Sequence, residues 1–305
     1  DHAGKLTYGG YGLAHVRAGW TLNPRMTVFA RRAALLLGSL EANFWRLLVA
    51  VLLLGAWAHG LGLGLDGVAF WWFFVGGLVG FGVGGVAMFQ SLPRLGSNLS
   101  TLIVQCGSAI IAATVEWLWL GTRLSPTQLA CGALTLGGIT LGLLPRSLPR
   151  VAPADWAEGV GWAVLSAFGQ GIGAVISRKA FATAGAWHQL VDPGTAAYQR
   201  GLGGLLFGAI FVLALRGRQR GPQPPQGRAW PWVLGNALTG PVLGVTSYQW
   251  ALRTTPAGIV QPIVAAAPLL TIPFAARLEG SRPHLTYYVG ALLAVAGVTG
   301  LVLWK

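Results

Sequence analysis

Charged side chains are scarce in this chain, and their scarcity excludes an ordinary soluble protein. Lys, Arg, Asp and Glu together make up 10% of the 305 residues, whereas apolar residues make up 54%. Soluble domains carry about 25% charged residues. A surface this poor in charge cannot face water, so most of the chain is expected to lie in lipid.

Cysteine and histidine are also scarce, with two cysteines (Cys106 and Cys131) and five histidines. Both cysteines lie inside apolar runs and form no CxxC pair. This excludes a disulfide framework and leaves them as small apolar side chains. The sequence has no HExxH, GxSxG or Walker phosphate-binding motif. We therefore expect no enzymatic activity, no metal site and no cofactor.

Acidic residues are few as well: eight Asp and Glu stand against 21 Lys and Arg, for a net charge of +13. The basic residues lie at the ends of apolar runs, where they contact lipid headgroups or set the topology. No basic face is interleaved with stacking aromatics, so a nucleic-acid partner is not expected. The partners indicated are membrane lipid and a small-molecule substrate, with the protein a monomer or a homodimer.

Long apolar runs are what the chain does have. A helix needs about 20 mostly apolar residues to span a membrane. Nine runs are close to that length: residues 42–59, 67–89, 97–120, 127–144, 159–177, 194–215, 230–251, 257–276 and 285–304. Their continuity excludes the alternating pattern of membrane β-strands. The sequence predicts an all-α polytopic membrane protein with about nine spans.

The two halves of the chain repeat each other. "MFQSLPRLGSN" (88–98) aligns with "SYQWALRTTPAG" (247–258), and "GALTLGGITLGLL" (132–144) aligns with "GALLAVAGVTGLVL" (290–303). The second unit holds five apolar runs, and an odd number of spans makes the second copy enter the membrane from the opposite side. Inverted-topology repeats of this kind build many secondary transporters, with the substrate near the midplane. The expected units are residues 26–150 and 151–305.

The first unit shows only four runs, because the place of its first span holds residues 12–30. That segment contains Arg17, Pro24 and Arg25, and each arginine costs about 2.5–3.5 kcal/mol at a helix centre. Our hypothesis is that residues 1–25 are an aberrant or truncated segment, from a shifted reading of the gene, and not the native helix. The alternative is an unusual amphipathic N-terminus.

These features resemble one family. Five-run units, an arginine opening the second span of each (Arg46 and Arg200), "ALRTTPAG" and "LGTRLS" are similar to EamA-type members of the drug/metabolite transporter superfamily. The resemblance implies ten helices, a central cavity and no nucleotide hydrolysis. The family's early "EP" is replaced by Ser108-Ala109 and Ala267-Pro268, and its "LGE" glutamate by Thr122. Proton coupling through those glutamates is therefore not carried over.

Polar side chains inside the apolar runs are the candidates for substrate binding. Such residues are costly in lipid and tend to face a cavity or another helix. The candidates are Thr101, Gln105, Ser108, Gln170, Asn236, Tyr248, Gln249 and Gln261. The alternative is that they only join helices by hydrogen bonds, although a glutamine has more polar atoms to satisfy than a serine or a threonine.

Three charged residues are candidates for a gate or for ion coupling: Arg46, Glu116 and Arg200. The arginines could instead mark helix starts near the membrane interface. Glu116 lies about one turn from the end of its run, where it could reach headgroups or an arginine. Glycines 76, 77, 80 and 84 recur at about one helical turn and indicate close helix packing.

These patterns favour a secondary transporter in a cell's inner membrane that moves a small amphipathic or zwitterionic metabolite, amino-acid-like or drug-like, by alternating access, as an exporter. The alternative is a non-transporting membrane scaffold or a decayed carrier. The loop arginines favour a C-terminus outside the cytoplasm, whereas the resemblance implies both termini inside, so the sequence leaves the orientation open.

Overall fold

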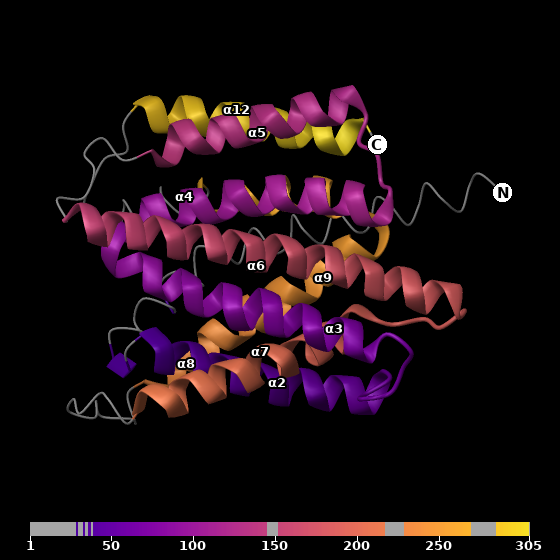
Figure 1. Cartoon of the computed structure of the whole chain (residues 1–305). Helices are drawn as coiled ribbons and strands as arrows, with labels where there is room; N and C mark the ends of the chain where they lie inside the picture. Colours follow the sequence, from indigo (N-terminus) through magenta and orange to yellow (C-terminus); the bar gives the residue numbers. More distant parts are fainter. Residues whose placement is uncertain are drawn as a thin grey trace.

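The computed structural model describes residues 29, 33, 36, 37, 39–144, 152–216, 229–269 and 285–304. Within them the elements are all helical (Figure 1), in the order α2 (Ser39–Leu61), α3 (Phe70–Gly77), η1 (Leu78–Val83), α4 (Gly84–Leu120), α5 (Pro126–Leu143), α6 (Pro153–Ala186), α7 (Pro193–Arg216), α8 (Trp230–Ala237), η3 (Leu238–Val245), α9 (Thr246–Thr254), α10 (Ala257–Ala265) and α12 (Leu285–Leu303). Residues 1–25, which the sequence analysis treats as an aberrant segment, lie outside the described residues. Of the doubtful first span at residues 12–30, only Phe29 is described.

Each of the nine predicted apolar runs contains helix in the described part of the chain, so the all-helical prediction is confirmed. Five helical segments there are long and apolar enough to cross a membrane. One of them, Phe70–Leu120, has 51 residues. A straight helix of that length would measure about 75 Å, far more than the roughly 30 Å hydrocarbon core of a bilayer.

That long segment turns back on itself at Gly96. The backbone there has φ 75° and ψ 168°, a conformation that glycine adopts without the penalty a Cβ would bring. Figure 1 shows α4 as two arms that diverge from this point at the left of the view. The segment therefore supplies two passes across the bundle, one before Gly96 and one after it.

The helices pack side by side in a bundle (Figure 1). α5 and α12 lie side by side along one edge, α2, α7 and α8 lie along the opposite edge, and α4 and α6 run between them. Large apolar side chains on the outer faces, such as Leu52, Trp71 and Leu292, are exposed. Lipid is the solvent in which such a surface is stable.

Glycines allow helix backbones to approach closely at several contacts. A Cβ on Gly77 of α3 would lie 1.8 Å from the backbone oxygen of Arg200 in α7, and one on Gly138 of α5 would lie 2.4 Å from the backbone nitrogen of Ala294 in α12. In lipid the hydrophobic effect does not drive helices together, so helix association depends on close packing, which small residues allow. The packing role predicted for the glycines of the third span agrees with these contacts.

Two π-helical segments occur at matching places in the two halves of the chain. η1 begins at Leu78 and η3 begins at Leu238, so their starts are 160 residues apart (238 − 78). This offset is close to that of the sequence repeat, which is 159 residues from Gln90 to Gln249 (249 − 90). Pro241 lies inside η3 and has no N–H to donate to a regular helical ladder. π-Helical turns are rare and occur frequently at functional sites.

The α5–α12 contact gives a test of glycine packing away from any cavity. We expect Gly138→Ala to lower the free energy of unfolding by about 1–3 kcal/mol, because the new methyl meets backbone atoms that cannot move aside. The adjacent Gly137→Ala, where a Cβ meets nothing within 4 Å, is the matched control and should be neutral. Detergent-solubilised unfolding measures both, and equal stability of the two variants would refute the packing argument.

Candidate functional site

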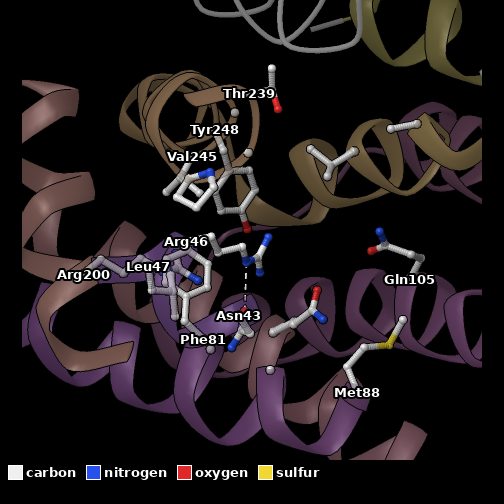
Figure 2. Close-up of a pocket in the computed structure, with 18 of the residues that line it drawn as sticks. Asn43, Arg46, Leu47, Phe81, Met88, Gln105, Arg200, Thr239, Val245 and Tyr248 are labelled. Atoms are coloured by element: carbon white, nitrogen blue, oxygen red, sulfur yellow. Dashed lines mark hydrogen bonds between the residues drawn. The ribbon is translucent and has the colours of Figure 1, made fainter. Parts of the chain in front are cut away.

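A cavity of about 470 Å³ lies in the bundle, and both halves of the chain line it (Figure 2). Its walls come from α2, η1, α4, α6, α7, η3, α9 and α10 and from the two residues that follow Ala266. The described lining residues are Asn43, Arg46, Leu47, Gly80, Phe81, Gly85, Met88, Phe89, Thr101, Gln105, Gln170, Arg200, Thr239, Gly240, Pro241, Gly244, Val245, Ser247, Tyr248, Gln261, Val264, Ala267 and Pro268. Both π-helical segments therefore contribute to the wall.

Two arginines reach this cavity from neighbouring helices. Arg46 of α2 donates from Nε to Oδ1 of Asn43, one turn earlier, at 2.9 Å; Figure 2 draws this bond as a dashed line. Arg200 of α7 is only 2% exposed and donates from Nη1 to Oγ of Ser177 at 2.8 Å. The sequence had left open an interfacial role for these arginines, but Arg200 is buried inside the bundle.

Aromatic rings and glycines surround the Arg200 guanidinium. Its central carbon lies 4.6 Å from the ring centre of Phe81 and 5.6 Å from that of Tyr248, distances at which a cation is attracted to a ring face. A Cβ on Gly80 would lie 2.7 Å from Nη2, and one on Gly173 would lie 3.2 Å from it. The glycines thus make the space that the guanidinium occupies.

The charged side chains that line the cavity, Arg46 and Arg200, are both positive. None of its described lining residues is Asp or Glu, and Nε of Arg200 is a buried donor without a hydrogen-bond partner. No three His, Cys, Asp or Glu side chains gather into a metal-binding group among the described residues. The arrangement offers hydrogen-bond donors and positive charge to a ligand, beside apolar surface.

The structure brings five of the eight candidate binding residues to the cavity wall. These are Thr101, Gln105, Gln170, Tyr248 and Gln261. They come from four helices, α4, α6, α9 and α10, so they converge from distant parts of the sequence. Figure 2 shows Gln105 across the cavity from Arg46 and Arg200, above Met88.

The other three candidates, Ser108, Asn236 and Gln249, are buried and absent from the described cavity lining. Oγ of Ser108 donates to the backbone oxygen of Gln105 on its own helix at 3.0 Å. Asn236 is 2% exposed, and its Oδ1 has no partner. Gln249 is fully buried and donates to Oγ of Ser177 at 3.4 Å, the same oxygen that accepts from Arg200. Gln249 therefore contacts the support of Arg200 and is absent from the described cavity lining.

Several lining residues were missed by the sequence analysis. Asn43 lies three residues before Arg46, a spacing that places both on one helix face, so this partner could have been found. Thr239 and Ser247 are common helix-joining types and carry no distinguishing signal. The apolar lining residues Leu47, Phe81 and Met88 cannot be told from lipid-facing positions without the fold.

Glu116 is absent from the described cavity lining and is 1% exposed. Its carboxylate accepts from Nε of Arg178 in α6 at 3.2 Å and from the backbone N–H of Gly258 in α10 at 3.0 Å. Nη1 of Arg178 also donates to the backbone oxygens of Leu252 at 2.7 Å and Arg253 at 3.3 Å. We call this group, Glu116 with Arg178 and these backbone atoms, the clasp; it joins α4, α6, α9 and α10 near one end of the bundle.

Comparison with known proteins identifies the class. The model of the EamA-like transporter family matches residues 25–144 and again residues 157–303. The chain therefore belongs to the EamA-like transporter family, within the drug/metabolite transporter superfamily, and is a multi-pass membrane transporter and not an enzyme. The expected resemblance is confirmed.

The fold has a close counterpart among solved structures. A crystal structure of a protein with 18% sequence identity aligns with a TM-score of 0.74, covering 96% of this chain and 99% of the other. At that identity the likeness concerns the fold alone. The search among curated proteins returned no match.

The clasp predicts a stability difference between two ion pairs. Glu116→Gln should lower the free energy of unfolding by about 2 kcal/mol, because it leaves the largely buried Arg178 charge without its counter-ion. Glu158→Gln is the matched control, since Glu158 pairs with Arg94 at 2.7 Å but is 49% exposed. Exposed pairs contribute about 0–1 kcal/mol.

The double variant Glu116→Gln/Arg178→Gln adds a check on that prediction. If the pair couples in the folded state, the double variant should be more stable than the sum of the two single losses implies. Additive losses, measured by unfolding in detergent, would contradict a direct interaction between the two side chains.

Proposed function

We propose that this transporter is a secondary carrier that moves a small amphipathic or zwitterionic metabolite by alternating access between two inverted repeats. We further propose that it resides in an inner membrane and works as an exporter, as the family resemblance implies. The observation that carries the proposal is a cavity lined jointly by residues from the first half of the chain, between 43 and 105, and from the second half, between 170 and 268.

The dimensions and lining of the cavity suit a small metabolite. Ligand sites in proteins commonly measure about 300–1,000 Å³ and combine apolar walls with a few placed polar groups. Here the polar groups include Gln105, Gln170 and Gln261, and the apolar ones include Met88 and Val264. A site near the middle of spans from both halves is where carriers built from inverted repeats hold their substrates.

The clasp supports a barrier at one end of the cavity. Glu116 belongs to the first half of the chain, whereas Arg178 and Gly258 belong to the second. Glu116 lies near the end of α4 and Gly258 near the start of α10, whereas Arg178 lies eight residues (186 − 178) before the end of α6. A carrier must break such contacts between halves when it opens that end, so the clasp would stabilise one of its two states.

A reversible cross-link beside the clasp tests this mechanism. A Cβ on Gly258 would lie 3.0 Å from the Cβ of Ala113, and disulfides need Cβ atoms about 3.5–4.5 Å apart. Ala113→Cys/Gly258→Cys, with Cys106 and Cys131 replaced by alanine, should form a disulfide between the halves after a small adjustment. Purified protein in liposomes is offered an equimolar mixture of amino acids, carboxylic acids and nucleosides, and mass spectrometry reads the lumen contents.

We expect at least one compound to accumulate with the reduced protein, to stop accumulating after oxidation, and to accumulate again after reduction. Ala113→Cys alone, treated identically, controls for oxidation and should transport throughout. Transport that continues through the cross-linked protein would reject alternating access at this end. Failure of every compound to enter, with the unmodified protein, would favour the non-transporting scaffold.

A further inference from the structure

We infer that the substrate of this cavity is an organic anion, with its acidic group held by Arg46 and Arg200 and its apolar body packed against residues such as Met88, Phe89 and Val264. The inference rests on the proposed transport function and narrows its substrate class. The acidic group that fits is a carboxylate or a phosphate monoester, since both present oxygens that match a guanidinium.

The first support is the balance of charge around the cavity. Arg46 and Arg200 line it, and none of the other described lining residues carries a negative charge. The nearest supports of these arginines are neutral: Asn43 for Arg46 and Ser177 for Arg200. A buried charge in a membrane is costly without an opposite charge, and an anionic ligand would supply that charge.

The second support is an unused donor on Arg200. Its Nη1 is engaged with Ser177, but its Nε is buried and has no partner. A buried unsatisfied donor costs about 1–3 kcal/mol, and a ligand oxygen would satisfy this one after a small movement of the Arg200 side chain that brings Nε to the cavity surface. Ser177, Gly80 and the Phe81 ring hold the guanidinium in place, which reduces the ordering that binding would require.

The third support is the spacing of the two arginines on packed helices. A Cβ on Gly201 of α7 would lie 3.0 Å from the side chain of Val51 of α2, which sets these positions at one level. Arg46 lies five residues before Val51, and Arg200 lies next to Gly201. At a rise of 1.5 Å per residue their backbones are about 9 Å apart along the bundle. Long side chains on both can converge on one acidic group between them.

The same lining disfavours a zwitterion. An ammonium group needs a carboxylate or the face of an aromatic ring, and the described lining offers no carboxylate. The ring faces of Phe81 and Tyr248 already lie beside the Arg200 guanidinium. Of the amphipathic and zwitterionic substrates expected from the sequence, the arrangement favours an amphipathic anion.

A matched set of one-ring compounds tests the inference by binding alone. The probes are phenylacetate, phenyl phosphate, phenylacetamide, 2-phenylethylamine and phenylalanine, each titrated calorimetrically into purified protein in detergent at fixed salt. We expect phenylacetate or phenyl phosphate to bind and the neutral, cationic and zwitterionic probes to bind at least about tenfold more weakly, a difference of one decade in Kd. Comparison of the two anions distinguishes a carboxylate site from a phosphate site.

Variants then assign the site. Arg46→Gln and Arg200→Gln should each raise the Kd of the bound anion about tenfold or more, since each removes a charge-assisted hydrogen bond. Arg123→Gln changes the net charge equally at an exposed position away from the described cavity lining, so it should leave the Kd unchanged. Arg200→Lys keeps the charge and should lose less affinity, which retains a test if Arg200→Gln does not fold.

Three outcomes would overturn the inference: phenylalanine or phenylacetamide binding as tightly as the anions, neither anion binding up to about 10 mM, or anion binding that survives both arginine substitutions. Anion binding to a protein that transports nothing in liposomes would support the site and reject the carrier. Transport of neutral compounds or amino acids without anion binding would support the carrier and reject the anion site.

Discussion

A guanidinium inside a membrane protein is costly unless polar or aromatic groups surround it, and much of the central architecture concerns how the chain accommodates Arg200. Glycines in α3, η1 and α6 let two helices approach it, the rings of Phe81 and Tyr248 lie against its faces, and Ser177 accepts one hydrogen bond. Gln249 donates to the same serine. These contacts fix the side chain firmly, but all of them are neutral, so the positive charge remains available within the cavity.

The helical architecture followed from the sequence because the bilayer fixes a length of apolar chain that few other structures require. The first and last residues of individual helices were harder to predict. α6 extends from Pro153 to Ala186, well beyond the apolar run at 159–177, because Glu158 and Arg178 find partners on α4 that no local pattern reveals. The break predicted between the runs at 67–89 and 97–120 lies where the structure reverses at Gly96. The π-helical segments η1 and η3 were missed because each lies inside a continuous apolar run that reads as ordinary helix.

The sequence indicated some residues of the candidate site and missed others. Three of the four glutamines proposed from the apolar runs line the cavity, which fits the tendency of costly polar side chains in lipid to face a cavity or another helix. Sequence could not separate them from Gln249, which is equally polar but fully buried. The apolar lining residues could not be predicted from the sequence. In a chain that is 54% apolar, a leucine or phenylalanine that faces the cavity looks like one that faces lipid.

The π-helical segments η1 and η3 have a geometric effect on the spans that contain them. A π-helical turn contains one more residue than an α-helical turn. The side chains that follow it are therefore rotated by about 100° around the helix axis relative to a regular α-helix. The stretch before η1, with Trp71 toward lipid, and the stretch after it, with Met88 toward the cavity, therefore need not share one stripe. Each such span can change the neighbour it faces halfway along its length while remaining a continuous rod.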